Sequence, residues 1–277
     1  MTLAGNNVKR IHYGIFTNCW YRRVAMKLRV LGCAGAELPD FRPPAFLLDD
    51  QLLLDAGTIG SVLNEEEQMK IHSIFITHTH LDHIRSIPAL ADNIIIRNQP
   101  HSVAVHATDE VIAALQNNLF NNIIWPDFTK ILSAGNPVIT LKTIVPYQAQ
   151  MVNDYRITAI PVNHTVPTVG YQVQSGGKTL VYTGDTGPTE EIWKYCSGAD
   201  VLIVEVSFPD SMRSMALLTK HLTPSMLVEE LAKIEVLPKR ILITHPKPQY
   251  FDRIFEEIGG IAISGVELLR DGSVYTV

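Results

Sequence analysis

The chain has few cysteines, no long apolar run and no surplus of basic residues. Only three of its 277 residues are cysteines, too few and too scattered for a disulfide framework or a paired-cysteine zinc site. We therefore expect Cys19, Cys33 and Cys196 to be free thiols in a reducing compartment, which predicts a cytoplasmic protein.

The missing apolar runs and basic surplus also limit the possible partners. No stretch of eighteen apolar residues is present, which argues against a membrane span, and polar residues interrupt every candidate signal segment near the N-terminus. With 23 basic and 28 acidic residues the net charge is −5, so nucleic acid and anionic membranes are not expected partners. A small anionic substrate is still compatible, because bound metal ions can dominate the charge of a cleft.

The composition, 46% hydrophobic and 18% charged, predicts a sizeable core. We expect residues 1–25 to form an N-terminal appendage of unknown role and residues 26–277 to form one domain. Short apolar runs alternate with helical stretches, which predicts an α/β fold with two sheets covered by helices. The expected strands are 28–32, 45–48, 51–55, 103–106, 155–162, 169–173, 179–183, 201–206 and 240–244, with a helix over about 224–235 and a final hairpin over 266–277 that turns at Asp271 and Gly272.

The segment 77–83, with the sequence THTHLDH, is the richest in chemistry. It places three imidazoles and a carboxylate directly after the apolar run 73–76. Histidine nitrogens combined with carboxylate oxygens suit zinc, manganese or iron(II) better than calcium or magnesium. The segment therefore predicts a metal site in a loop at the rim of a sheet.

Other polar groups fall at or near the ends of separate apolar runs. His164 follows 160–162, Asp185 follows 180–182, and His245 follows 241–244. Glu205 interrupts the apolar run 201–206. If these strands share a direction, their ends lie along one rim, where the scattered groups would converge.

These motifs, together with Asp55 in LLLDAG, resemble the five-motif set of the metallo-β-lactamase superfamily. The resemblance covers the chain from about residue 28 to its C-terminus and implies an αββα sandwich with a two-metal site at one edge. It implies that His78, His80 and His164 hold one metal, that Asp82, His83 and His245 hold the second, and that Asp185 bridges them. Asp55 would lie behind these ligands and orient one of them. A carboxylate between two cations offsets their repulsion, and a hydroxide bridging the metals is the expected nucleophile.

Further residues resemble the phosphodiesterase branch, specifically class II 3′,5′-cyclic-nucleotide phosphodiesterases. The segments EVSFP at 205–209, HLTP at 221–224 and NNIIWPDF at 121–128 are similar to that group. The branch implies that His221, supported by Glu205, protonates the leaving oxygen, so that His221, Glu205 and Asp82 are the expected catalytic residues. Lys220 departs from the pattern, since the relatives usually have Gly there. Phe128 and Trp125 are expected to be core residues rather than groups that stack on a base.

The expected activity is therefore hydrolysis of cyclic nucleotides to nucleoside 5′-monophosphates by an enzyme with two divalent metal ions, zinc or manganese.

A tRNase Z-like nuclease is the first alternative, but only twenty residues separate His164 from Asp185, where those nucleases usually carry a protruding arm. A glyoxalase II-like thioester or lactone hydrolase is the second alternative and would not require His221 and Glu205. A metal-free structural relative is a third, and it would be expected to have lost ligands, none of which is missing here. We expect an exposed apolar face near 120–128, which would suit a homodimer.

Overall fold

The computed structural model describes residues 1, 25–97, 99–133 and 135–277. The predicted appendage, residues 1–25, therefore lies almost entirely outside the described residues, as does Cys19. Cys33 and Cys196 are buried free thiols, as expected from the scattered cysteines.

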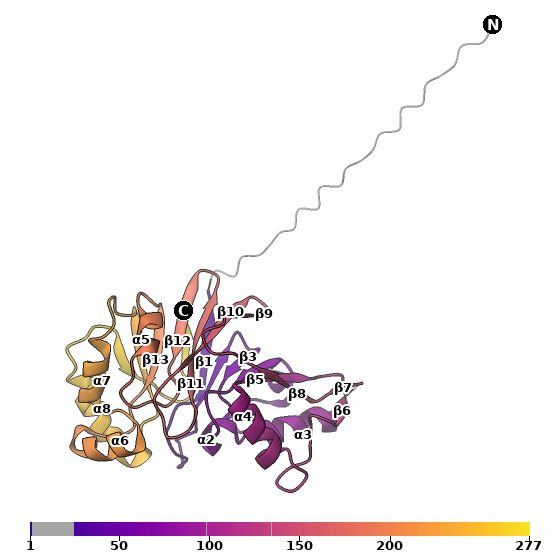
Figure 1. The fold of residues 1–277 in the computed structure, drawn as a ribbon, viewed down its shortest axis with the longest axis horizontal. Coiled ribbons are helices and arrows are strands. Elements are labelled where there is room, and N and C mark those ends of the chain that lie inside the picture. Colours follow the sequence, from indigo (N-terminus) through magenta and orange to yellow (C-terminus); the bar gives the residue numbers. More distant parts are fainter. Residues whose placement is uncertain (2–24, 98, 134) are drawn as a thin grey trace.

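Two seven-stranded sheets form the centre of the molecule (Figure 1). The first sheet has the strand order β16-β1-β2-β3-β4-β5-β8. Its strands are β1 (Lys27–Gly32), β2 (Ala45–Leu48), β3 (Leu52–Leu54), β4 (Ser73–Phe75), β5 (Val103–Ala107), β8 (Ile139–Thr143) and β16 (Val274–Thr276). The expected strands 45–48 and 51–55 correspond to β2 and β3, which pair in an antiparallel register with Leu48 opposite Leu52.

The second sheet has the order β15-β14-β13-β12-β11-β10-β9. Its strands are β9 (Gln150–Val152), β10 (Tyr155–Pro161), β11 (Val169–Ser175), β12 (Lys178–Tyr182), β13 (Val201–Glu205), β14 (Arg240–Thr244) and β15 (Val266–Leu268). All five residues of β13 are buried, as expected for a central parallel strand covered on both faces. A small third sheet pairs β6 (Leu132–Ser133) with β7 (Asn136–Pro137).

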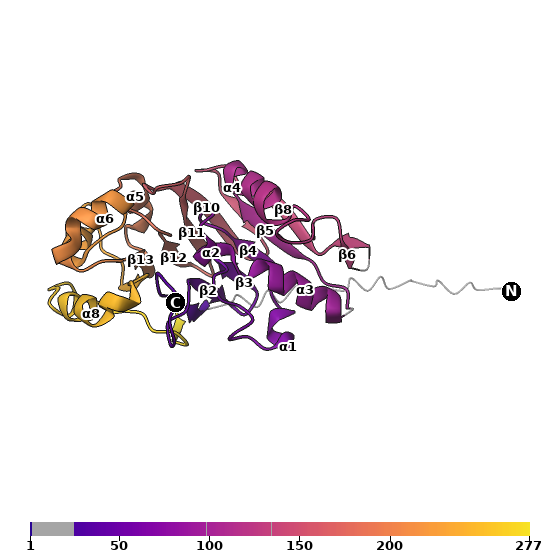
Figure 2. The same ribbon diagram turned by 90° about the horizontal axis from the view of Figure 1, so that it is seen from below.

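Helices cover the outer faces of both sheets (Figure 2). On the side of the first sheet they are α1 (Glu65–Gln68), α2 (Leu81–Ile84), α3 (Ile87–Arg97) and α4 (Asp109–Ala114), which continues into a π-helical turn (Leu115–Leu119). On the side of the second sheet they are α5 (Glu191–Cys196), α6 (Arg213–Thr219), α7 (Pro224–Leu231) and α8 (Phe251–Gly259). Thr223 caps α7 through its side chain and Pro224 occupies the first turn, the favoured arrangement for a helix start.

Three buried clusters hold these layers together, because strand side chains alternate between the two faces of each sheet. Leu52 and Leu54 face the other sheet and join the cluster between the sheets. Leu53, between them, packs into the cluster beneath the helices of the first sheet. A third cluster lies between the second sheet and α5 to α8. The αββα sandwich is thereby confirmed.

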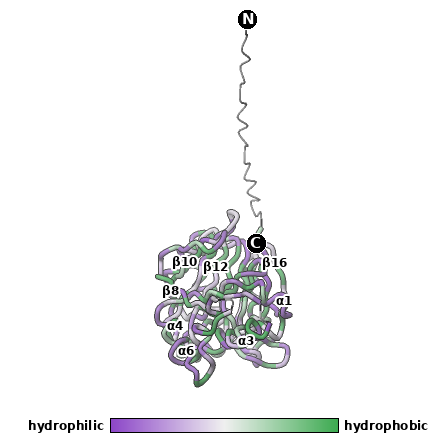
Figure 3. The backbone as a smooth tube through the Cα atoms, turned by 90° about the vertical axis from the view of Figure 1, so that its right-hand side faces the viewer, coloured by the Kyte–Doolittle hydropathy of each residue, from purple (hydrophilic) through white to green (hydrophobic). Residues whose placement is uncertain are grey.

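Hydropathy alternates along the backbone, and Figure 3 shows short hydrophobic stretches broken by hydrophilic ones. Among the residues that the structure describes, no helix has the length and apolar character needed to span a bilayer.

The predicted C-terminal hairpin is wrong. The strand β15 pairs with β14 in the second sheet, whereas β16 pairs with β1 in the first. The turn at Asp271 and Gly272 therefore passes between the sheets instead of folding two strands against each other. Its position is fixed because the Asp271 carboxylate accepts hydrogen bonds from the backbone N–H groups of Cys33 and Arg42, at 3.0 and 2.9 Å.

The predicted apolar face near residues 120–128 is only partly exposed. Phe120 and Phe128 are 2% and 3% exposed and belong to the core, whereas Ile123 and Ile124 are 85% and 61% exposed. Trp125 packs against the same core cluster as Phe128, as expected. A homodimer through the two isoleucines stays a prediction.

Candidate metal centre

Strand direction brings the scattered polar groups to one edge of the second sheet. The strands β12, β13 and β14 run parallel, and β10 shares their direction because β11 is antiparallel to both β10 and β12. Their carboxyl ends therefore lie along the same edge. His164, Asp185 and His245 follow β10, β12 and β14, and Glu205 is the last residue of β13.

The loop 77–83 leaves the first sheet after β4 and joins the same edge. The backbone N–H of Val169 donates to the Thr77 carbonyl at 3.1 Å, and the Tyr171 hydroxyl donates to the Ile76 carbonyl at 2.7 Å. Gly184, with φ +62°, lies so close that a Cβ there would be 2.9 Å from the Thr77 Cβ. The two sheets are thus locked together where the candidate ligands emerge.

The candidate ligands form two contiguous groups at this edge. His78, His80, His164 and Asp185 form the first group, with their ligand atoms within 4.8 Å of one another. Asp82, His83 and His245 form the second group by the same measure. The two groups contain the residues of the two sets that the resemblance implies, with Asp185 in the first group.

One carboxylate oxygen, Oδ2 of Asp185, lies between the groups. It is 3.8 Å from His78 Nε2 and 4.0 Å from His164 Nε2 in the first group. It is 3.4 Å from His83 Nε2 and 3.2 Å from His245 Nε2 in the second. Asp185 is therefore placed to contact cations held by either group.

Hydrogen bonds on the far side fix the orientation of four imidazoles, so that their Nε2 atoms face the centre. The Nδ1 atom of His78 contacts Thr77 Oγ1 at 3.0 Å, and that of His164 contacts the Lys220 carbonyl at 3.0 Å. The Nδ1 atom of His245 contacts Ser207 Oγ at 2.9 Å. Such outer partners set the tautomer and direction of metal-binding histidines.

The fourth of these imidazoles, His83, is held by Asp55, a buried carboxylate that collects several donors. Its Oδ2 is 2.7 Å from His83 Nδ1 and accepts a hydrogen bond from the Tyr182 hydroxyl at 2.8 Å. Its Oδ1 accepts from the Thr77 backbone N–H at 2.8 Å. The residue adopts a left-handed φ of +57°, which Asp tolerates better than most residues. Asp55 therefore orients both His83 and the start of the loop.

The polar atoms at the centre are arranged to bind cations and not to hydrogen-bond to one another. Three ring nitrogens face each other, since His80 Nδ1 is 3.0 Å from His78 Nε2 and 3.3 Å from His164 Nε2. The His164 ring donates through Nδ1 to a carbonyl, so its Nε2 presents a lone pair when the ring is neutral. Among the described residues, buried His83 Nε2 and Asp185 Oδ1 have no hydrogen-bond partner. Convergent lone pairs and orphaned buried atoms are what divalent metals satisfy.

The charges of the site also favour cations. Burial would lower the pKa of His83, but the carboxylates of Asp185 and Asp55 outweigh burial and raise that pKa well above its ordinary value. Burial would raise the pKa of Asp185, but His245 and His83 hold it well below the usual range. Both shifts have the same cause: the carboxylates of the site stay negatively charged and favour positive charge beside them.

Glu205 and His221 form a pair at the side of the cluster, where His221 also lies within 4.8 Å of the ligand atoms of Asp185 and His245. Glu205 is fully buried, and its Oε1 lies 2.6 Å from His221 Nδ1. The His221 ring centroid is 5.0 Å from that of His164 and 5.3 Å from that of His245. Burial would lower the pKa of His221, but the charge of Glu205 and its hydrogen bond outweigh that effect and raise it.

The structure thus brings together all ten residues that the sequence singled out, and it adds Ser207 and Tyr182 as their hydrogen-bond partners. The Ser207 hydroxyl contacts Glu205 Oε2 at 2.9 Å, His221 Nδ1 at 3.1 Å and His245 Nδ1 at 2.9 Å. Its position two residues after Glu205 could have suggested this contact. Tyr182 is the last residue of β12, and nothing in the sequence around it indicates its contact with Asp55.

The fold and this site define a metallohydrolase class. The family model described as "Beta-lactamase superfamily domain" matches residues 52–245, more than half of the chain. The chain therefore belongs to the β-lactamase superfamily, with the metallo-β-lactamase fold, and it is a hydrolase whose His/Asp clusters imply divalent metals.

Relatives in this family carry two kinds of name. A "Probable 3′,5′-cyclic-nucleotide phosphodiesterase" of Yersinia pestis is 27% identical over 66% of this chain and 59% of its own length. A "Ribonuclease Z" of Haloferax volcanii is 23% identical over 82% of this chain and 86% of its own length. The match thus spans about three fifths of the Yersinia protein and most of the Haloferax protein.

Solved structures show the same fold. Unliganded yeast PDE1 superimposes with a TM-score of 0.77 at 19% identity, over 91% of this chain and 99% of that one. The short form of human tRNase Z superimposes with a TM-score of 0.69 at 21% identity, over 90% and 98%. At these identities the two comparisons show the shared fold.

Proposed function

We propose that the protein is a binuclear metal-dependent phosphodiesterase that hydrolyses the 3′ ester of 3′,5′-cyclic nucleotides to give nucleoside 5′-monophosphates. The observation that carries this proposal is the 2.6 Å pair between Glu205 and His221 beside the histidine cluster. A thioester hydrolase has less need of such a pair, because thiolates leave readily without a proton.

Each ligand group would hold one of the two metal ions. His78, His80 and His164 would hold one ion, Asp82, His83 and His245 the other, and Asp185 would contact both. Zinc or manganese suits this mixture of imidazoles and carboxylates. When bound, the two ions supply a nucleophilic water of lowered pKa and stabilise charge on the phosphoryl oxygens.

His221 would donate the proton that the departing 3′ alkoxide needs. Its Nδ1 faces Glu205, so Nε2 is the atom free to face the substrate. A carboxylate partner favours the protonated ring, which raises the fraction of His221 able to donate near neutral pH. Glu205 keeps its position because it also accepts a hydrogen bond from the backbone N–H of Thr186 at 3.0 Å.

A ribonuclease Z-like activity is the second candidate, because the Haloferax relative matches most of its own length. However, the described residues between His164 and Asp185 form a tight hairpin of β11 and β12, with no inserted segment that could reach along a tRNA. The net charge of −5 also disfavours a polyanionic substrate.

The test replaces His221 with Ala and compares two leaving groups. We expect kcat for a cyclic nucleotide to fall about 10²–10⁴-fold, while hydrolysis of bis(p-nitrophenyl) phosphate changes little, since nitrophenolate leaves without a proton. Metal analysis should show unchanged content. His72→Ala, at an exposed histidine before β4, is the matched control.

Equal losses on both substrates, or loss of metal, would refute the proton-donor role. A parallel screen with pre-tRNA and a thioester separates the alternatives. Cleavage of pre-tRNA with no cyclic-nucleotide hydrolysis would replace the proposal with the nuclease.

A further inference from the structure

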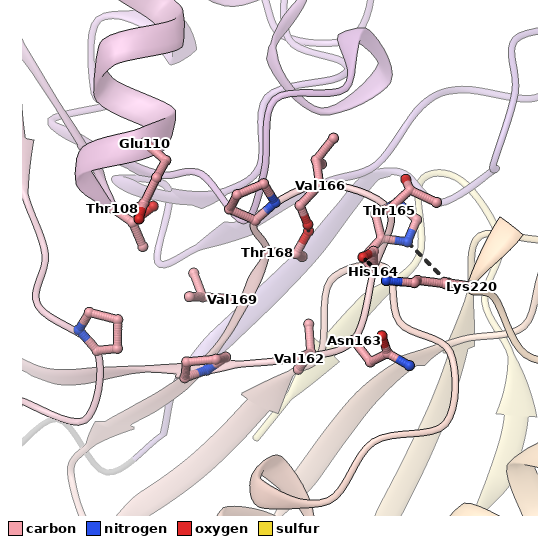
Figure 4. Close-up of a pocket in the computed structure, with 13 residues that line it drawn as sticks. Thr108, Glu110, Val162, Asn163, His164, Thr165, Val166, Thr168, Val169 and Lys220 are labelled. Atoms are coloured by element: carbon pink, nitrogen blue, oxygen red, sulfur yellow. Dashed lines mark hydrogen bonds between the residues drawn. The ribbon is translucent and has the colours of Figure 1, made fainter.

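A pocket of about 500 Å³ opens beside His164, with a volume in the range that small-molecule sites occupy. Figure 4 shows Thr108 and Glu110, at the start of α4, on one side of this pocket and His164 and Lys220 on the other. His164 belongs to the first ligand group and lines the pocket, so the pocket adjoins the metal centre at this residue.

The His164 side of the pocket is tied down by reciprocal contacts. The Lys220 Nζ donates to the His164 carbonyl at 2.8 Å, and the Lys220 carbonyl is 3.0 Å from His164 Nδ1. Lys220 adopts a left-handed φ of +54°, a conformation that these two contacts help to hold. This side is therefore rigid and cationic.

Thr108, on the other side, has a buried hydroxyl without a partner. The residue is 6% exposed, and its Oγ1 makes no hydrogen bond to any described residue. Thr108 precedes α4 at the capping position, yet its side chain makes no capping bond, although Thr there usually does. The oxygen itself has almost no accessible surface, but Thr108 lines the pocket, so rotation of its side chain about the Cα–Cβ bond would bring the unpaired hydroxyl to a ligand there.

Glu110 supplies the negative charge on this side. Within the described part of the chain, no side-chain hydrogen bond or ion pair engages its carboxylate, and the residue is exposed at the pocket. An acceptor-only group at the end of the pocket away from the metals selects ligands that present donors there.

We propose that this pocket holds the nucleoside part of the substrate, that Thr108 bonds it, and that Glu110 makes the enzyme prefer guanine to adenine. The inference rests on the proposed cyclic-nucleotide activity. Guanine presents two adjacent donors, N1–H and the N2 amino group, to a carboxylate. Adenine presents one donor, its N6 amino group, beside the acceptor N1, which a carboxylate repels.

The main test is a change of specificity at Glu110. The unaltered enzyme should have a kcat/KM for cyclic GMP at least about tenfold above that for cyclic AMP, the discrimination expected of one good paired contact. Glu110→Gln should abolish the preference, because an amide pairs through its acceptor and donor with adenine N6 and N1 as well as with guanine N1–H and O6. Glu66→Gln, at an exposed residue of α1, is the matched control and should leave the ratio unchanged.

Thr108→Val preserves shape and removes the hydroxyl. It should raise KM for both nucleotides about fivefold, the loss of one neutral hydrogen bond, with kcat unchanged. None of these variants should alter hydrolysis of bis(p-nitrophenyl) phosphate, which has no base or sugar.

The outcomes separate this inference from the proposed function. Hydrolysis of both cyclic nucleotides without preference, or a preference that Glu110→Gln leaves unchanged, overturns the inference and leaves the function standing. If neither nucleotide is hydrolysed, the proposed cyclic-nucleotide activity is refuted. Titration of the protein with 5′-GMP and 5′-AMP then tests whether the pocket prefers guanine. Tighter binding of 5′-GMP that Glu110→Gln abolishes supports it, and equal binding overturns it.

Discussion

The two sheets contribute to the site in opposite ways. The first sheet supplies His78, His80, Asp82 and His83 from a single loop after β4, whereas the second supplies His164, Asp185 and His245 from the ends of three strands. A contiguous loop keeps its ligands together through local geometry. Ligands on separate strands depend on correct register across the whole sheet, so the second half of the site should be more sensitive to changes in the fold.

The largest effect is expected at Asp185, the residue that joins the two halves. Asp185→Asn weakens the contact to both ligand groups, so we expect bound metal to fall well below two equivalents and activity to fall at least about 10²–10³-fold. Metal analysis of protein purified without chelator checks this. Two bound equivalents in the variant would show that the halves hold their metals independently.

A smaller effect is expected behind the loop of the first sheet. Asp55→Asn keeps a residue that tolerates left-handed backbone but weakens the contact with His83 Nδ1. Loss of an outer partner typically costs 10–100-fold in metal affinity, measured by competition with a chromophoric chelator. Tyr182→Phe removes only one donor to Asp55 and should cost less. Unchanged affinity in Asp55→Asn would mean that the loop holds its ligands without help from this carboxylate.

Gly184 tests how closely the sheets must approach. Gly184→Ala places a Cβ 2.9 Å from the Thr77 Cβ at φ +62°, so overpacking and backbone strain should together lower the free energy of unfolding by about 2–4 kcal/mol. Gly198 has φ +70°, but a Cβ added there would meet no atom within 4 Å, so Gly198→Ala should cost only the strain, about 1–2 kcal/mol. Urea denaturation measures both. Equal costs would show that the two loops can separate freely.

The smallest effect lies at the opposite edge of the second sheet. Asp200, just before β13, accepts hydrogen bonds from the Thr179 backbone N–H at 2.9 Å and from Lys239 Nζ at 2.8 Å. Burial would raise its pKa, but these partners and Lys178 outweigh that effect and lower it.

A lowered folded-state pKa stabilises the protein above the unfolded value, near 4, and the gain is lost as pH falls through the folded pKa. Asp200→Asn should therefore lower the free energy of unfolding by about 0.5–1 kcal/mol at pH 7, and the difference should shrink below pH 4. Metal content should not change. A difference that is constant with pH would assign the effect to packing instead of charge.

The same contrast explains which parts could be predicted from the sequence. The loop 77–83 could be recognised because its ligands are adjacent, and His164, Asp185 and His245 could be recognised because each follows an apolar run. The turn at Asp271 and Gly272 was predicted wrongly, because a two-residue turn between apolar segments does not reveal that β15 and β16 join different sheets. Only tertiary pairing decides that.

Thr108 and Glu110 were not predicted as site residues for a similar reason. Thr108 stands directly before Asp109 and Glu110, a pattern typical of a helix start, where Thr normally bonds the helix backbone. Only the folded chain shows that this hydroxyl is unpaired and that α4 begins beside the loop carrying His164.

The pairing of β1 with β16 also has a consequence for synthesis on the ribosome. The strand β1 is complete early in translation, yet its partner β16 comprises Val274–Thr276, and the backbone N–H of Val277 donates to the Met26 carbonyl at 2.9 Å. One side of β1 therefore stays unpaired until β16, the last of the described strands, leaves the exit tunnel. A nascent chain stalled before that point would carry an open strand edge, the kind of surface that chaperones shield and that otherwise seeds aggregation.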